Sequence, residues 1–248
     1  ALIVAPTNIF PLGFIKAYSI GVGVYKVLWS PTVMKEIYHH VINREQRDSM
    51  WVYLIGFSAG GQAVTRYMLI RQTIFDSIPL RMAVSVSPLH YTFPTDKLND
   101  TFMPFICGLY PYYRYDSFSY GDFGLPYDCD SKVVMYYNDN YGVLIGTNDL
   151  NKSKDSTGAS PCLAEQGSNR YESAQNFYAF ADSNALNRGT VLKWKYAEVP
   201  GVGHDGYAMY NTKAQLSDTF SIAENMLFNS PYSSPVMLPP YATIKAEI

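Results

Sequence analysis

WVYLIGFSAG, residues 51–60, is the stretch of sequence that decides the fold. Its first half, 51–55, is a short apolar run rich in aromatic and β-branched side chains, which predicts a strand that runs directly into Gly56. Apolar residues then recur at helical spacing from Ala59 to Arg71, at Ala63, Tyr67 and Ile70. A strand, a sharp turn and a helix therefore follow one another without a gap, and the turn places Ser58 between glycines.

Short apolar runs alternate with helical stretches on both sides of this segment. Further strands are expected at Leu2–Ala5, Met82–Val86, Val143–Gly146 and Val191–Val199. Helices are expected at Thr32–Asn43, at Arg170–Asn187 and from about Tyr207 to Leu227. This alternation predicts the α/β class, with a mostly parallel central sheet covered by helices on both faces. Chains of this length often form one α/β domain, so residues 1–248 are interpreted as a single domain.

The stretch Leu89–Ser131 interrupts the alternation. It is rich in Pro, Gly, Tyr and Asp, shows no clear period and is longer than most loops within compact domains. It is interpreted as a cap or lid insertion over the site. Its aromatic residues either line a pocket for the acyl or leaving group or pack the insertion against the body of the domain: Tyr110, Tyr112, Tyr113, Tyr115, Phe118, Tyr120 and Phe123.

The charge and hydropathy of the chain argue against nucleic-acid binding and against a transmembrane segment. Its 19 basic and 21 acidic residues leave a net charge of -2 with no run of like charge, which argues against nucleic acid as a partner. The sequence lacks the roughly 18 consecutive apolar residues of a transmembrane helix. The oligomeric state is left open by the sequence.

Cysteine and tyrosine usage favours an extracellular, lumenal or periplasmic protein. The chain has 22 tyrosines and three cysteines, and Cys129 and Cys162, both in polar sequence, are predicted to form a disulfide while Cys107 stays a small buried apolar residue. None of the cysteines has the spacing of a metal site. Asn99-Asp100-Thr101 and Asn151-Lys152-Ser153 fit the acceptor pattern for N-glycosylation in a secreting eukaryote.

Ser58 is the predicted nucleophile. A serine hydroxyl attacks a carbonyl only when a base takes its proton and the backbone holds it exposed, and a Gly-x-Ser-x-Gly turn between a strand and a helix provides that exposure. An ordinary glycine-rich turn is the other interpretation, but the strand before it and the helix after it favour a nucleophile elbow.

The Ala59 N–H at the start of the helix is the first expected oxyanion donor. The second should follow the first strand, at Thr7 or Asn8, and the choice stays open.

His204 and Asp149 complete the predicted catalytic group. The base should follow the last strand, and of the four histidines only His204 does so, after Gly201-Val202-Gly203. Asp149 follows the expected strand Val143–Gly146 and would hold the imidazole in the required tautomer. The other interpretation is an aspartate that only forms a turn at the end of that strand. Asp155 is the reserve acid. No metal or cofactor is required for this chemistry.

Four segments of the chain resemble a largely uncharacterised family of secreted or periplasmic α/β-hydrolases, distantly related to dienelactone hydrolases and polyester depolymerases. They are Tyr53–Gln62 with Arg66-Tyr67, Gly146–Asp149, Ala164–Arg170 with Asn176–Tyr178, and Glu198–His204. The resemblance implies a triad of Ser58, Asp149 and His204. Phe57 stands where that family usually has histidine, and we expect this difference to leave the triad unaffected. Because the insertion is longer and more aromatic than is usual in the family, the resemblance does not by itself identify the substrate.

The favoured function is hydrolysis of a small-molecule or polymer ester, rather than an amide, through an acyl-enzyme formed on Ser58. Acyl transfer to an acceptor other than water would use the same residues. The alternative from another class is a catalytically silent protein of the same fold that serves as a structural or interaction subunit, because a fold does not fix a function.

Overall fold

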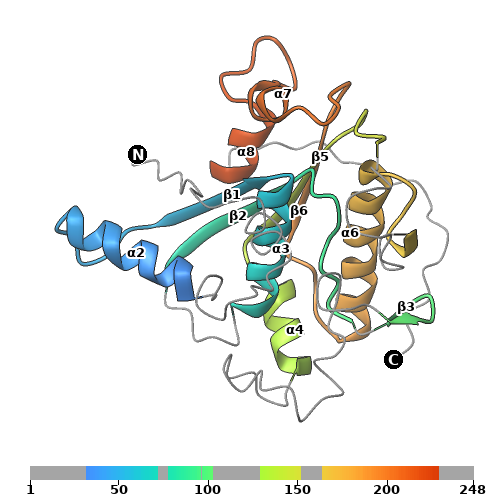
Figure 1. Ribbon diagram of the computed structural model, residues 1–248, viewed down its shortest axis with the longest axis horizontal. Helices are drawn as coiled ribbons and strands as arrows, with labels where there is room; N and C mark the ends of the chain where they lie inside the picture. Colours follow the sequence, from blue (N-terminus) through green and yellow to red (C-terminus); the bar gives the residue numbers. More distant parts are fainter. Residues whose placement is uncertain (1–31, 72–77, 96, 103–128, 152–163, 229–248) are drawn as a thin grey trace, which may run out of the picture.

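A parallel sheet forms the centre of the molecule. The computed structural model describes residues 32–71, 78–95, 97–102, 129–151 and 164–228. Within these residues four strands pair in the order β1-β2-β5-β6, all parallel (Figure 1). They are β1 Val52–Phe57, β2 Leu80–Val86, β5 Tyr141–Gly146 and β6 Lys195–Val199. A short antiparallel pair, β3 Lys97–Leu98 and β4 Thr101–Phe102, lies outside the sheet.

The strands expected from the apolar runs at 51–55, 82–86 and 143–146 are confirmed, with ends shifted by one or two residues. The last strand begins at Lys195 rather than Val191. The register explains the difference: Lys195 pairs with Gly142, one residue after β5 begins, so the residues before Lys195 have little strand to pair with. Val191 is instead 69% exposed. The expected strand Leu2–Ala5 lies outside the described residues.

The helices are α2 Thr32–Arg44, α3 Ala59–Ile70, α4 Cys129–Tyr137, α6 Arg170–Asn187, α7 Gly206–Asn211 and α8 Ile222–Phe228. Helix α6 has the bounds expected from the sequence. The single helix expected from Tyr207 to Leu227 is wrong, because the chain becomes extended at Thr212 and starts a new helix after Ser221. Ser221 and Glu224 there exchange backbone and side-chain hydrogen bonds as a capping box.

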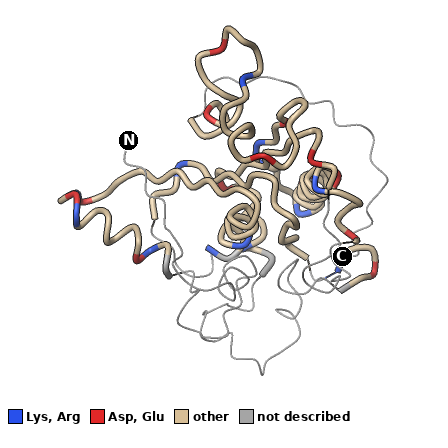
Figure 2. The backbone as a smooth tube through the Cα atoms, turned by 45° about the horizontal axis from the view of Figure 1, so that its top comes forward, with Lys and Arg blue, Asp and Glu red and all other residues tan. Residues whose placement is uncertain are grey.

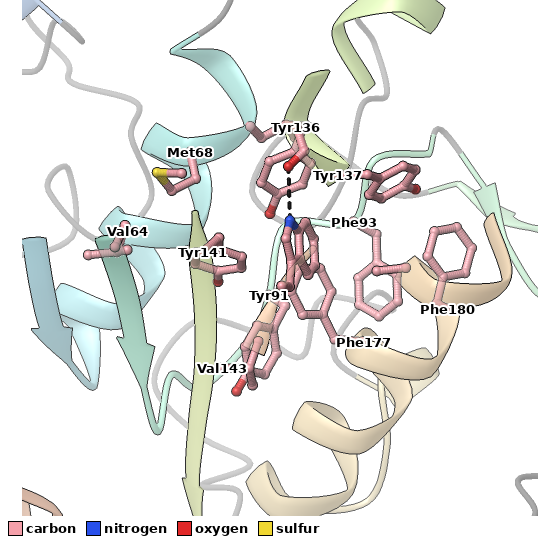
Figure 3. Close-up of a cluster of buried hydrophobic side chains, with 14 of the residues drawn as sticks. Val64, Met68, Tyr91, Phe93, Tyr136, Tyr137, Tyr141, Val143, Phe177 and Phe180 are labelled. Carbon is pink, nitrogen blue, oxygen red and sulfur yellow. Dashed lines mark hydrogen bonds between the residues drawn. The ribbon is translucent and has the colours of Figure 1, made fainter. Parts of the chain in front are cut away.

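Two layers of helices cover the sheet. On one face, α3, α4 and α6 bury residues of β5 that include Tyr141, Val143 and Ile145, around the aromatic cluster of Figure 3. On the other face, α7 and α8 bury Leu144 of the same strand with Met82, Val84 and Val86 of β2. Successive side chains of a strand thus enter opposite cores, as the period of two requires. The α/β fold expected from the sequence is therefore present.

The described beginning of the expected insertion belongs to the core. Tyr91 and Phe93 are fully buried, and the Tyr91 ring stacks on Phe177 of α6 at 4.5 Å between ring centroids. The last residues of the expected insertion form the first turn of α4. Residues 103–128, which include most of its aromatic side chains, lie outside the described residues, so the cap stays a prediction.

The expectations about redox state and location also stay predictions. Cys107 and Cys162 lie outside the described residues, and so does the expected pairing of Cys162 with Cys129. Asn99, in the first acceptor triplet, is exposed in the turn between β3 and β4, where its Nδ2 donates to Glu165 at 3.2 Å. This position leaves the amide within reach of the solvent.

Charged residues of both signs are spread over the described part of the chain (Figure 2). At the end of α2, for example, Arg44 and Glu45 form an exposed ion pair at 3.7 Å. Among the described helices, none combines the length and the apolar character needed to span a bilayer.

Candidate active site

Ser58 is the single residue between β1 and α3. Its backbone has φ 53° and ψ -114°, a positive φ that a non-glycine residue seldom adopts and that costs conformational energy. The main chain on both sides fixes this geometry: the Ser58 N–H donates to Val86 O at 2.9 Å, and the Gln62 N–H donates to Ser58 O at 3.1 Å. The strand–turn–helix arrangement expected for a nucleophile elbow is therefore present, and Ala59 is the first residue of its helix.

Two glycines allow the helix to pass close to the strands. A Cβ on Gly56 would lie 2.3 Å from Gly60 O, and one on Gly61 would lie 2.9 Å from Val86 O. By contrast, a Cβ on Gly60 would meet nothing within 4 Å. The close approach therefore depends on Gly56 and Gly61, and the last glycine of the Gly-x-Ser-x-Gly pattern is not sterically required.

Gly56→Ala should lower the free energy of unfolding by about 3 kcal/mol, because the new methyl group collides with backbone atoms that cannot move without shifting α3. Gly60→Ala is the matched control and should leave stability unchanged or raise it, since alanine favours a helix more than glycine does. Urea unfolding of both variants checks this. Equal midpoints for the two would contradict the packing described above.

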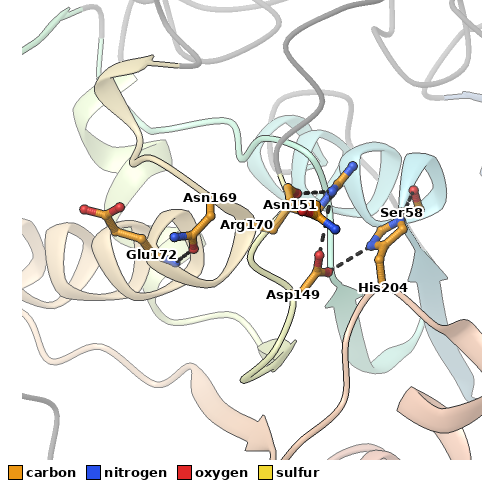
Figure 4. A network of polar contacts seen from close by, with 7 residues as sticks. All are labelled: Ser58, Asp149, Asn151, Asn169, Arg170, Glu172 and His204. Carbon is orange, nitrogen blue, oxygen red and sulfur yellow. Dashed lines mark hydrogen bonds and ion pairs between the residues drawn. The ribbon is translucent and has the colours of Figure 1, made fainter.

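Three polar side chains from separate parts of the chain meet in one line (Figure 4). The Ser58 Oγ lies 3.0 Å from His204 Nε2, and His204 Nδ1 lies 2.9 Å from Asp149 Oδ2. Ser58 follows β1, Asp149 follows β5 and His204 follows β6, so all three lie at the carboxyl edge of the parallel sheet. An ionised Asp149 can only accept, which makes Nδ1 the protonated nitrogen and leaves Nε2 able to take the serine proton.

The loops that carry Asp149 and His204 are hydrogen-bonded to each other. Thr147 Oγ1 accepts from the Gly201 N–H at 2.8 Å, and Asn148 donates from its backbone to Val202 O at 2.9 Å and from its side chain to Gly201 O at 3.0 Å. The turn expected from the Gly146–Asp149 sequence therefore also holds the histidine loop. Sequence reasoning had assigned no such role to Thr147 or Asn148.

Asp149 is almost completely buried, with 1% of its surface exposed. Its Oδ1, the oxygen not bonded to His204, lies 3.7 Å from Arg170 Nη1, and the same Nη1 donates to Asn151 O. Burial lowers the pKa of Arg170, while the Asp149 carboxylate acts in the opposite direction. Sequence reasoning had not assigned a role to Arg170.

Phe57 contacts the imidazole. The rings of Phe57 and His204 are stacked, with centroids 4.7 Å apart and planes inclined by 30°. The expectation that this difference leaves the catalytic group unaffected stays a prediction, and the structure adds that Phe57 packs directly on His204. A Cβ on Gly206, two residues after His204, would lie 3.2 Å from the Phe57 ring, so the close packing of this ring favours glycine at that position.

The remaining candidates divide into two groups. Thr7, Asn8 and Asp155 lie outside the described residues, so the second oxyanion donor and the reserve acid stay predictions. Of the other histidines, His39 and His40 are exposed on α2. His90 is buried and its Nδ1 lies 2.6 Å from Gln62 Nε2. The described residues contain no group of three or more His, Cys, Asp or Glu side chains placed to hold a metal ion.

No protein-family model and no curated protein matches the chain. Among solved structures, it is similar to a poly(3-hydroxybutyrate) depolymerase from Bordetella parapertussis, with 25% identity over 79% of this chain and a TM-score of 0.59. It is also similar to poly(aspartic acid) hydrolase-1 from Sphingomonas sp. KT-1, with 20% identity over 79% of this chain and a TM-score of 0.60. The chain spans 60% of the depolymerase and 68% of the poly(aspartic acid) hydrolase. The protein has the α/β-hydrolase fold.

Proposed function

We propose that this protein is a serine hydrolase that cleaves carboxylic esters, in preference to amides, through an acyl-enzyme on Ser58. The observation that carries the proposal is the contact of Ser58 Oγ with His204 Nε2 at 3.0 Å, on an elbow with positive φ and with Asp149 behind the imidazole. Nucleophile, base and orienting acid in hydrogen-bond reach of one another are the arrangement that acyl transfer needs.

The reaction follows from these contacts. His204 Nε2 takes the Ser58 hydroxyl proton as Oγ bonds to the ester carbonyl carbon, and the carbonyl oxygen becomes negatively charged. The Ala59 N–H, at the start of α3, stabilises that oxygen with a second donor at Thr7 or Asn8. The C–O bond to the alcohol then breaks, and His204 gives its proton to the leaving oxygen. Water attacks the acyl-enzyme with the same proton transfers, which releases the acid and restores Ser58.

The likeness to a polyester depolymerase supports an ester as the substrate, either a small molecule or a chain end of a polymer. The likeness to the poly(aspartic acid) hydrolase, at 20% identity, shows the fold alone and supports no substrate. An ester is also easier to cleave than an amide for the proposed group of residues. An alkoxide is a much weaker base than the nitrogen anion of an amide, so its departure depends less on protonation by His204.

The test is labelling with a fluorophosphonate beside turnover of p-nitrophenyl esters of increasing acyl length. We expect covalent labelling of one serine in the folded protein and hydrolysis of at least the short acyl esters. The labelled peptide, identified by mass spectrometry, should contain Ser58. A folded protein that neither labels nor turns over any ester would favour the catalytically silent alternative, in which the same fold serves as an interaction subunit.

A further inference from the structure

We propose that Arg170 is a positioning residue for the catalytic group, acting through Asp149 rather than on the substrate. The proposal rests on the function proposed above and adds a fourth residue to it. The two carboxylate oxygens of Asp149 have different surroundings. Oδ2 is bonded to His204, whereas Oδ1 is buried and has no hydrogen-bond partner among the described residues.

A buried carboxylate needs compensation for its charge. The side chain of Asp149 is fully buried, and removing an ion from water is unfavourable unless an opposite charge lies nearby. Arg170 Nη1 lies 3.7 Å from the bare Oδ1 and only 11% of its side chain is exposed. The guanidinium is therefore placed to hold Oδ1, which leaves Oδ2 turned toward the imidazole (Figure 4).

Arg170 also ties the loop that carries the acid to helix α6. Its Nη1 donates to Asn151 O, and the Tyr171 N–H donates to Asp149 O at 3.1 Å. The start of α6 thus contacts the acid loop through a side chain and through the backbone. These contacts hold Asp149 at two points. Tyr171 binds its backbone carbonyl, and Arg170 lies beside its carboxylate oxygen Oδ1.

The first turn of α6 is itself held by local hydrogen bonds. Asn169 Oδ1 accepts from the Glu172 N–H at 2.8 Å, and the Glu172 carboxylate accepts from the Ser168 N–H at 2.7 Å. Asn169 thus caps the helix while Glu172 binds the residue before the cap, and together these bonds fix the helix start from which Arg170 projects. The backbone and the side chain of Asp149 are therefore held by the start of helix α6 rather than by a second loop.

The experiment compares Arg170→Met, which keeps the length but removes the charge, with Arg170→Lys, which keeps the charge but lacks the planar fork. For Arg170→Met we expect kcat on a p-nitrophenyl ester to fall about a hundred-fold at unchanged KM, since a small displacement of a catalytic side chain has that cost. Arg170→Lys should recover part of the loss. If Arg170→Met does not fold, Arg170→Lys alone should still show a lowered kcat at unchanged KM.

Arg71→Met is the matched control. Arg71 forms a similarly buried ion pair with Asp139, at 3.0 Å between Nη1 and Oδ1, at the other end of α3 from the serine. We expect this variant to lose stability without losing kcat. Equal losses of kcat in the Arg71 and Arg170 variants would overturn the proposal, because the ion pair would then matter only for folding. So would an Arg170→Met enzyme with the kcat of the unmodified protein.

A spectroscopic measurement separates this proposal from the proposed function. The hydrogen bond between His204 Nδ1 and Asp149 should give a low-field proton resonance that is absent in Asp149→Asn. We expect Arg170→Met to broaden or remove this resonance and Arg71→Met to retain it. That result would support positioning even if the protein cleaved no ester, whereas a resonance unchanged in Arg170→Met would overturn it even if the esterase activity were established.

Discussion

Ser58→Ala should remove fluorophosphonate labelling and lower kcat on an activated ester by about a million-fold, the loss seen when the serine of such a triad is removed. The hydroxyl is the atom that bonds to the substrate, and the Ser58 Oγ is the oxygen that His204 Nε2 contacts. Alanine leaves the elbow backbone unchanged in shape, so the variant should fold with the stability of the unmodified protein. Turnover, labelling and thermal midpoint are measured together.

Ser87→Ala is the matched control. Ser87 also follows a strand directly and has a positive φ of 46°, but it is fully buried, and its Oγ has no hydrogen-bond partner among the described residues. We expect this variant to label and to turn over ester as the unmodified protein does. Labelling that persists in Ser58→Ala would place the nucleophile at another serine.

Asp149→Asn should lower kcat by about ten-thousand-fold, as the same change does in a serine protease. Asparagine keeps the shape of the side chain, but its amide can donate to Nδ1 and so stabilise the tautomer whose Nε2 is already protonated. That imidazole cannot accept the serine proton. The loss should appear in kcat/KM on a p-nitrophenyl ester, with the fold checked by circular dichroism.

Asp155→Asn separates the two acids considered from the sequence. Asp149 lies 2.9 Å from His204 Nδ1, so replacing Asp155 should change turnover little. Asp139→Asn serves as a second control, because it removes a carboxylate from the ion pair with Arg71 at the other end of α3 from the serine. Turnover that survives in Asp149→Asn and collapses in Asp155→Asn would mean that the loop after residue 151 folds back over the histidine.

The parts of the site that sequence reasoning identified are those set by local pattern and chain order. The run at 51–60 contains a strand, a turn and a helix start in ten residues, so its backbone was predictable without any distant contact. His204 and Asp149 followed from their places after the last two expected strands. Parallel strands end at one edge of a sheet, and this rule brings the three side chains together.

The parts that the sequence did not indicate depend on contacts between distant segments. Arg170 begins a helix whose bounds were predictable, but its approach to Asp149 depends on how α6 packs beside β5. No contact was expected of Phe57 from the sequence, whereas its ring packs on an imidazole 147 positions later. The break between α7 and α8 was missed, although Ser221 and Glu224 have the spacing of a capping box and form its two hydrogen bonds.

The separation of Ser58 and His204 by 146 positions has a consequence for how the chain acquires activity. A ribosome synthesises the elbow long before it reaches His204, so a nascent chain carries the serine without its base. The contact requires β1, β2, β5 and β6 to pair in order, and such long-range pairing forms slowly. Recovery of the proposed esterase activity during refolding should therefore follow the pairing of β6 with β5, later than the recovery of helical circular dichroism.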